Sequence, residues 1–443
     1  MPNNEEFMFP DKERFEWFEA HARTVVAHCR RTTVLPGISD TPVGIYVPGG
    51  DDKYPSFWIR DYVMQCRFGF IDGVEMKTAL LFFLSHQNGS ERRELANGLR
   101  LDPWSIPDHI NVPGGGNPEF HRTYANGAVF FPGSYSPTDN QGSGRYGLRP
   151  ADDDIYEVIE LTRLVAGFLP QFQRIEFLQD KLGDVSIIDR LHFGMMTMTV
   201  DLETGLCRNT PDNWAAANFH DALKPMGLIS VTSCLRFRAA KTMIGFYSLL
   251  GNKKQEEQYG SLAEQIAKFA VSKLMLPSGW LIVGTEIDRQ PDVWATSMAV
   301  YYGLLQGEYA TAACEAMLKA YLDGTVAASG YLRHTPTTAD AIPGKKIWED
   351  DSGGGYGTYQ SGGYWPQPLG YYAFAMAKTD PDTARQIACE FIDHTRSLVD
   401  EGAPFEWFNP AIPLKDTPGL GRWYGASVTL PLEGFRRLDK ELR

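Results

Sequence analysis

The most constraining feature of this sequence is a series of helical segments that come in pairs. Apolar residues repeat at intervals of three and four along much of the chain, as in Leu235, Ala239, Met243 and Phe246, and Gly251 then ends that segment. Connections are short inside each pair and longer between pairs. A chain of this kind buries its apolar stripes by packing helix against helix, so we predict an all-α fold.

The predicted helices span most of the chain outside five long connections. They cover residues 12–30, 59–71, 74–86, 152–168, 171–181, 184–199, 227–250, 254–274, 291–306, 309–322, 366–378, 382–399 and 426–438. In the last pair, Asp380 has the position of an N-cap and Pro381 that of the first helical residue.

The connections between the pairs are long and rich in Gly, Pro, Asn and aromatic residues. They cover residues 100–150, 201–226, 276–290, 324–364 and 400–425. Loops of this length are uncommon in a compact domain unless they form a site. Six helical hairpins closed into a ring would gather the loops on one face. We therefore predict an (α/α)6 toroid, a six-hairpin barrel with short β-hairpins on one face, as a single domain over residues 1–443.

Aromatic, guanidinium and carboxylate side chains cluster at the edges of the helical segments. The clearest cluster is Trp58-Ile59-Arg60-Asp61, at the start of an apolar helical run. Aromatic faces stack on the apolar faces of pyranose rings, while Arg and Asp bind hydroxyl groups through charge-assisted hydrogen bonds. Similar mixtures occur at residues 211–214, 290–294, 347–351 and 405–407. Together these clusters predict one carbohydrate-processing cleft.

Charge and hydropathy argue against several classes of partner. The net charge of −13 disfavours nucleic acid and an anionic membrane surface as main partners, and also polyanionic substrates unless a local basic patch overrides it. No apolar run approaches membrane-spanning length, and residues 1–6 lack the pattern of a signal peptide. As the sequence stands, we expect a cytoplasmic protein, and the sequence assigns no oligomeric state.

Metal, nucleotide and serine-nucleophile chemistry are not indicated. The six cysteines include no CxxC pair, so buried thiols in a reducing compartment are expected. There is no HExxH motif and no pair of histidines at metal spacing on one helix. The glycine runs do not lie between a strand and a helix, and no Ser occupies a nucleophile elbow. We therefore expect no metal and no cofactor.

Five stretches, in this order, resemble elements of the six-hairpin glycosidases, the (α/α)6-barrel hydrolases that include glucoamylases, trehalases and the family 63 glucosidases. Residues 57–61 resemble the substrate-clamping Arg-Asp or Trp-Asp element, residues 212–214 the Asp-Asn element that carries the general acid in family 63 enzymes, and residues 293–304 a core helix. Residues 359–365 resemble the "YQNGG-W" loop, with Ser361 in place of the usual Asn, and residues 405–410 the stretch with the catalytic base.

The resemblance implies an inverting glycoside hydrolase that acts on a small oligosaccharide or glycoside. Asp212 would be the general acid and Glu406 the general base that activates water. Inversion implies carboxyl groups separated by about 6.5–9.5 Å. The acid needs surroundings that raise its pKa, and Trp214 would be an apolar neighbour. The Ser-Gly usual before the acid is replaced by residues 209–211, Asn-Thr-Pro.

The predicted substrate-binding residues come from the same clusters and loops. They are Trp58, Arg60, Asp61, Trp214, His220, Asp221, Glu286, Tyr359, Gln360, Trp365 and Trp407. Asp221 is a rival general acid, although its position is also that of a helix cap. Asp212 follows a proline and is equally consistent with an Asx-turn. For Glu406, the structural alternative is an ion pair with a residue such as Arg422.

Two other function classes fit the same toroid. A polysaccharide lyase or sugar epimerase would use His or Tyr in place of paired carboxylates, and the residues of interest would then be His121, His220, His334, Tyr359 and Tyr364. A third possibility is a carbohydrate-binding protein that retains the cleft without catalysis. The reaction products distinguish a hydrolase from a lyase, because hydrolysis leaves a free reducing end and a lyase leaves an unsaturated sugar.

Overall fold

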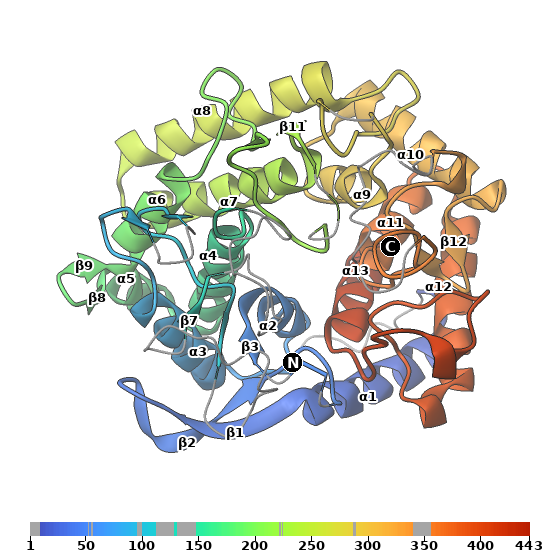
Figure 1. The fold of residues 1–443 in the computed structure, drawn as a ribbon, viewed down its shortest axis with the longest axis horizontal. Coiled ribbons are helices and arrows are strands. Elements are labelled where there is room, and N and C mark those ends of the chain that lie inside the picture. The colour runs from blue at the N-terminus through green and yellow to red at the C-terminus, as the bar shows by residue number, and fades with distance from the viewer. Residues whose placement is uncertain are drawn as a thin grey trace.

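The described part of the chain consists mainly of helices arranged around one centre (Figure 1). This computed structural model describes residues 9–51, 53–54, 56–94, 100–111, 128–130, 148–220, 223, 225–286, 289–339 and 356–443. The strands are few and short. The prediction of a predominantly helical fold with short strands is confirmed. None of the described helices combines the length and the apolar character that a membrane crossing requires.

Six inner helices form a closed circuit of contacts. In order, they are α2 (Ile59–Cys66), α4 (Asp154–Phe168), α7 (Ser230–Leu249), α9 (Val293–Tyr301), α11 (Leu369–Ala377) and α13 (Ala426–Leu442). Each packs against the next, and α13 packs against α2. Every residue of α2, α9 and α11 is buried, because neighbours cover these helices on all sides.

Outer helices surround this inner circuit, and at least one of them precedes each inner helix in the chain. They are α1 (Lys12–Cys29), α3 (Gly73–Ser85), α5 (Gln171–Gln179), α6 (Ile187–Met196), α8 (Lys253–Phe269), α10 (Gly307–Leu322) and α12 (Pro381–Ser397). A π-helix, Ala270–Leu274, continues α8. The Asp380 carboxylate accepts hydrogen bonds from the N–H groups of Asp382 and Thr383, which confirms the predicted N-cap of α12.

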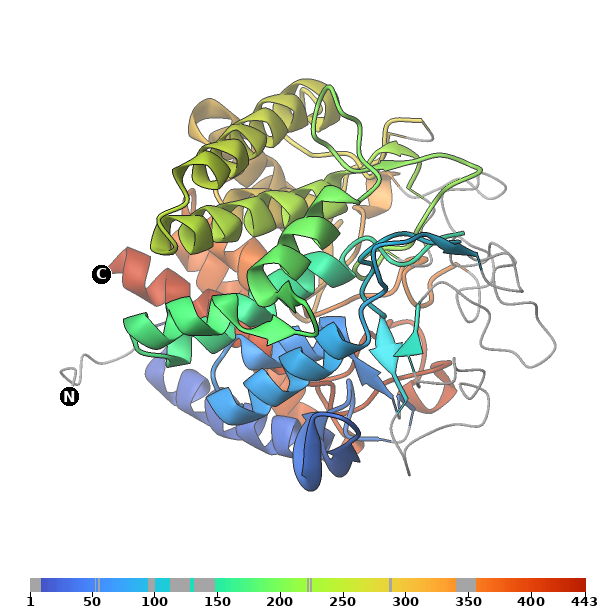
Figure 2. The same cartoon turned by 90° about the vertical axis from the view of Figure 1, so that its left-hand side faces the viewer.

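The strands form hairpins and one small sheet. The pairs are β1 (Arg30–Leu35) with β2 (Ser39–Tyr46), β4 (Arg93–Glu94) with β5 (Arg100–Leu101), β8 (Lys181–Leu182) with β9 (Val185–Ser186), β10 (Arg208–Asn209) with β11 (Gly227–Leu228), and β12 (Ala327–Ala328) with β13 (Tyr331–Leu332). The antiparallel sheet contains β3 (Phe57–Trp58), β6 (His109–Ile110) and β7 (Ala128–Val129). Figure 2 shows this sheet on the side away from the two termini.

The two ends of the inner circuit differ in what surrounds them. The chain enters α2 directly from β3, so the N-terminal end of α2 adjoins the small sheet. The C-terminal parts of α4, α7 and α13 line one common cavity, together with residues at the ends of α2 and α9. These five inner helices therefore run in the same direction, and the described parts of the loops before their N-terminal ends lie at the opposite end from the cavity (Figure 2).

The cysteines agree with the sequence prediction of buried thiols. All six are free, and only Cys389 is partly exposed.

Candidate active site

Glu406 is a buried carboxylate in the loop between α12 and α13, and it is only 1% exposed. The hydroxyl group of Tyr54 donates to its two oxygens, at 3.0 Å and 2.8 Å. The Lys53 ammonium group lies 2.8 Å from Oε2. Glu406 thus has a cation and a hydroxyl donor from the segment before α2, and its ion-pair partner is Lys53 rather than Arg422. These contacts join the last hairpin to the first.

Asp61 is a second buried carboxyl group, in the first turn of α2. The Tyr424 hydroxyl donates to its Oδ1 at 2.5 Å. Burial raises the pKa of Asp61 to about 7; the Tyr424 hydrogen bond and Arg60 oppose that rise, and the negative charge of Glu406 adds to it. Asp61 therefore carries a proton over part of the neutral pH range.

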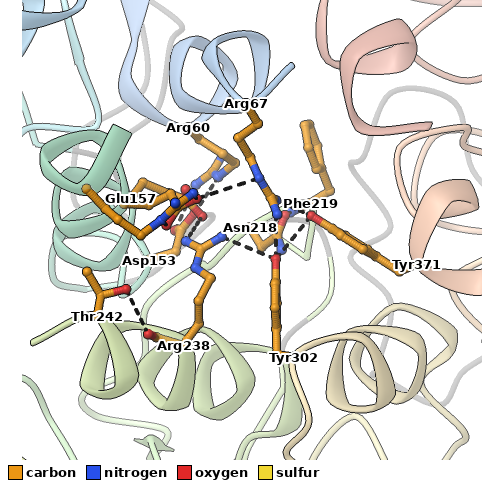
Figure 3. Close-up of polar contacts among 12 residues, drawn as sticks. Arg60, Arg67, Asp153, Glu157, Asn218, Phe219, Arg238, Thr242, Tyr302 and Tyr371 are labelled. Carbon is orange, nitrogen blue, oxygen red and sulfur yellow. Dashed lines mark hydrogen bonds and ion pairs between the residues drawn. The ribbon is translucent and has the colours of Figure 1, made fainter. Parts of the chain in front are cut away.

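Arg60 has different partners from Asp61, although the two residues are adjacent. Its guanidinium group donates to both oxygens of Asp153, at 2.5 Å and 3.0 Å (Figure 3). It also lies 3.5 Å from Asp108. Arg60 is 5% exposed and Asp153 is fully buried. The pair holds the start of α4 against α2, so much of the hydrogen-bonding capacity of Arg60 is used within the protein.

Asp153 belongs to a run of three buried carboxyl groups that the sequence prediction missed. Asp152 pairs with Arg149. Burial raises the pKa of Asp154 well above its ordinary value, and the neighbouring Asp108 and Asp153 add to the effect. The sequence does contain an indication of this run, namely three consecutive aspartates at residues 152–154, where an apolar helix begins. Carboxyl groups at a buried helix start need either ion-pair partners or protons.

An aromatic cluster lies beside these carboxyl groups, with Phe219 at its centre. The Phe219 ring lies 5.3 Å from Trp294, 5.5 Å from Trp365 and 6.5 Å from Tyr424. The Arg60 guanidinium group lies 5.9 Å from the Phe219 ring. The predicted residue Trp365 is therefore in one cluster with Tyr424, which binds Asp61, and with Arg60.

Further predicted aromatic residues extend this cluster. Tyr359 lies 4.9 Å from Trp365 and 6.2 Å from Trp407, measured between ring centroids. Trp58 lies 5.6 Å from Tyr54, the residue that binds Glu406, and stacks on His109 at 4.5 Å. Gln360 is completely buried in the loop of Tyr359. Aromatic rings from four loops thus surround the segments that carry Asp61 and Glu406.

His220 and His334 form a buried pair at the edge of the aromatic cluster. Nε2 of His220 lies 3.1 Å from Asp292, which also caps α9. His334 stacks on Trp294 and binds the carbonyl of Phe219 at 2.5 Å. Burial lowers the pKa of His334 well below its ordinary value, and His220 contributes to the same effect. His334 is therefore neutral at physiological pH.

Among the described residues, five non-glycine residues have a positive φ angle, and three of them lie in these loops. Asn218, Tyr359 and Trp423 have φ angles of 53°, 44° and 50°, in the left-handed region that non-glycine residues rarely adopt. Each residue either belongs to the aromatic cluster or directly precedes a member of it. Such conformations concentrate at functional sites, where the surrounding structure holds them in place.

The structure does not bring Asp212 or Glu286 to this cluster. Asp212 is fully exposed in a turn, and a hydrogen bond from the Thr210 side chain lowers its pKa. The side chain of Glu286 is 45% exposed and lies 3.6 Å from Arg208. Trp214 is buried near β10, where its carbonyl accepts a hydrogen bond from Leu148. Asp221, His121 and the acidic stretch 347–351 lie outside the described residues.

Sequence reasoning missed the direct partners of the two carboxyl groups. Lys53 and Tyr54 precede the Trp-Ile-Arg-Asp stretch by a few residues, and Tyr424 lies just before α13. The only sequence feature that could have indicated these partners is that each is aromatic or cationic and lies in a loop next to a helix end. Among the described residues, no group of three His, Cys, Asp or Glu side chains is arranged to hold a metal ion.

Solved structures of other proteins have a similar overall fold. No protein-family model and no curated protein matches the chain. A wild-type glycosidase is similar in structure, with a TM-score of 0.56, 12% identity and coverage of 96% of this chain and 98% of that one. The GH63 mannosylglycerate hydrolase from Thermus thermophilus, in complex with glucose, has a TM-score of 0.54, 12% identity and coverage of 94% and 99%. The chain therefore shares its overall fold with these glycosidases, in agreement with the resemblance of its sequence motifs to glycosidase elements.

Proposed function

We propose that this protein is an inverting glycoside hydrolase that acts on a small oligosaccharide or glycoside, with one (α/α)6-toroidal catalytic domain. The observation that carries the proposal is the placement of two buried carboxyl groups, Asp61 and Glu406, among aromatic rings at the loop face. The structural similarity to glycosidases supports it. Carbohydrate sites combine such rings, which stack on sugars, with carboxyl groups that bind hydroxyl groups or transfer protons.

In this proposal Glu406 is the general base. Tyr54 and Lys53 fix the orientation of its carboxylate, and the Lys53 charge compensates the buried negative charge. A water molecule bound to Glu406 would give up its proton as it attacks the anomeric carbon on the face opposite the leaving group. Asp61 would bind a sugar hydroxyl group, as the resemblance of residues 57–61 to the substrate clamp implies.

The general acid in this proposal is Asp221 rather than Asp212. An acid must hold a proton at the working pH, whereas Asp212 is fully exposed and its pKa is lowered. Phe219 and His220 belong to the buried cluster, and Asp221 follows them in the chain, although it lies outside the described residues. This connection in sequence is what supports Asp221.

The histidine-based alternative has less support. Nε2 of His334 contacts the Phe219 carbonyl, and His220 contacts Asp292, so a ring nitrogen of each takes part in a structural contact. Tyr364 pairs through its backbone with Phe408. A lyase or an epimerase remains distinguishable from a hydrolase by its products.

The test combines a substrate screen with one substitution. Activity is first sought on chromogenic glycosides and oligosaccharides, and proton NMR then identifies the anomer that is released first. Glu406→Gln should retain the fold and lower turnover by about two to four orders of magnitude, the contribution of a general acid or base. The matched control is Glu401→Gln, an exposed glutamate on the same loop.

Three results would contradict the proposal. Near-native activity of folded Glu406→Gln would remove its role as base. Release of an unsaturated sugar would indicate a lyase. Binding of sugars without turnover of any substrate would indicate a carbohydrate-binding protein.

A further inference from the structure

A large cavity lies at the end of the inner circuit opposite to Glu406. Its volume is about 910 Å³, and its wall includes the C-terminal parts of α4, α7 and α13 together with Arg67, Tyr301 and Tyr302. Helix α13 has 17 residues, so about 25 Å separates its two ends. The cavity is therefore distinct from the proposed carbohydrate site, and nothing in that proposal uses it.

The wall of this cavity is strongly cationic. Eight of its side chains are Arg or Lys and two are Glu, in a protein whose net charge is −13. A concentration of positive charge against the sign of the whole molecule favours binding of anions at this place. The cavity wall is thus a local basic patch that the overall composition of the chain does not reveal.

The inner part of the wall is explained by ion pairs within the protein. Arg67 lies 2.9 Å from Glu433, and Arg238 lies 2.9 Å from Glu157. Both arginines donate to the Tyr302 hydroxyl group at 3.2 Å, and Tyr302 in turn donates to Tyr371 at 3.1 Å (Figure 3). The side chains of Arg67 and Arg238 are 3% and 8% exposed. These buried charges are compensated without a ligand.

The rest of the wall carries cations without such compensation. Arg174, Lys241, Arg436 and Lys440 form no ion pair with a carboxylate of the described residues. Arg174 donates to the Leu169 carbonyl at 2.7 Å. Lys241 and Lys440 are exposed and come from different helices, α7 and α13. Their ammonium groups are available to a molecule in the cavity.

Helix dipoles offset only part of this charge. Residues at or near the C-terminal ends of five inner helices line the cavity, and each helix end carries about half a negative charge. Against the four cations without ion pairs, this leaves about one and a half positive charges. A bound anion with two charges would complete the compensation.

We propose that this cavity binds a small oxyanion with two or more negative charges, such as a phosphate ester or a polycarboxylate. The cavity volume is in the range of small-molecule sites, about 300–1,000 Å³. Arg and Lys are the side chains that bind phosphate and carboxylate groups through charge-assisted hydrogen bonds. Lys241 on α7 and Lys440 on α13 contact the ligand from two sides.

Isothermal titration calorimetry of the full chain tests the proposal. The titrants are inorganic pyrophosphate, glucose 6-phosphate and citrate at constant ionic strength, so that a free inorganic anion, a sugar phosphate and a polycarboxylate are distinguished. At least one should bind, and its dissociation constant should increase with NaCl concentration. In the double variant Lys241→Glu/Lys440→Glu, this constant should rise by at least about tenfold.

The matched control is Lys254→Glu/Lys273→Glu, which makes the same change in net charge at exposed positions outside the cavity. Its affinity for the anion should stay within about twofold of the wild type, less than about 0.5 kcal/mol. Thermal denaturation of both variants verifies that they are folded. The proposal is overturned if none of the three anions binds more tightly than about 10 mM, if the control weakens binding equally, or if only a long polyanion such as heparin binds.

Discussion

Two neighbouring carboxyl groups in this protein have different partners, and the difference determines what each can do. Glu406 faces a lysine ammonium group and a tyrosine hydroxyl group. Asp61 has a tyrosine hydroxyl group as its hydrogen-bond donor and the negative charge of Glu406 nearby. Burial and the like charge of Glu406 favour the protonated form of Asp61.

The raised pKa of Asp61 has a measurable consequence for stability. Its folded pKa of about 7 exceeds the ordinary value of 3.8, so between these values the folded state holds a proton that the unfolded state has lost. The stability that this proton contributes is present below about pH 4 and is lost as the pH rises through about 7. Asp61→Asn cannot ionise, so its melting temperature relative to wild type should rise between about pH 4 and about pH 7 and level off above that. A difference that does not vary with pH would contradict the raised pKa.

The two candidate acids are separated by the leaving group of the substrate. A general acid matters most for poor leaving groups, because activated aryl glycosides depart with little proton assistance. Asp221→Ala should therefore lose most activity on a disaccharide and much less on a nitrophenyl glycoside, while Asp212→Ala should affect both substrates slightly and alike. If Asp212→Ala shows the leaving-group dependence, our assignment of the acid is wrong and the glycosidase proposal still stands.

Sequence reasoning at the residue scale identified side chains better than it identified their partners. Glu406, flanked by two aromatic residues, was predicted to matter, and it is buried. Arg60 and Asp61 were treated as one clamp. Consecutive residues of a helix point about 100° apart, so Asp61 meets Tyr424 while Arg60 meets Asp153. A local motif does not reveal which distant loop will contact the side chain of each of its residues.

At the scale of elements, apolar periodicity predicted the helices well and their ends less well. The helix predicted over residues 382–399 is α12, Pro381–Ser397. The helix predicted over residues 59–71 ends at Cys66, and Gly69 then has a φ angle of 90°. Every residue of α2 is buried, including Arg60 and Asp61, so the pattern of apolar residues does not mark where this helix stops. The glycine in the left-handed region does mark it.

One helix contact depends on two glycines. A Cβ atom on Gly434 of α13 would lie 2.3 Å from the Cα atom of Gly370 on α11. Gly434→Ala should therefore force the helices apart and lower the free energy of unfolding by about 1–3 kcal/mol, as overpacking does. Urea denaturation followed by circular dichroism measures the change.

The control for that substitution lies within α8. A Cβ atom on Gly260 would meet nothing within 4 Å. Gly260→Ala should therefore stabilise the protein by about 0.5–1 kcal/mol, because alanine loses less entropy in a helix. Equal effects of the two substitutions would contradict the importance of the close contact.

At the scale of the whole molecule, the last helix closes the circuit. Helix α13 packs against α11, α2 and α1, so it joins the end of the chain to its beginning. The pairing of helices along the sequence predicted a ring, since each pair has only its neighbours to pack against. Which loops become neighbours is decided only when the ring closes, so it could not be predicted from the sequence of any one segment.

Removal of the last helix tests this closure. A chain that ends at residue 425 lacks α13 and exposes the apolar faces of α2 and α11. It should lose the cooperative thermal transition that circular dichroism detects in the full chain. A chain that ends at residue 440 retains the packed part of α13 and should melt cooperatively. A cooperative transition in the shorter chain would show that the ring does not need its last helix.

The meeting of Tyr54 and Asp61 with Glu406 and Tyr424 also bears on synthesis of the protein. The two halves of this constellation are separated by more than three hundred residues. A nascent chain emerging from the ribosome exposes the first half long before the second exists. The contacts of Tyr54 with Glu406 and of Tyr424 with Asp61 can therefore form only after residues 406 and 424 have been synthesised. Until then, the carboxyl group of Asp61 has no hydroxyl group of Tyr424 to bind.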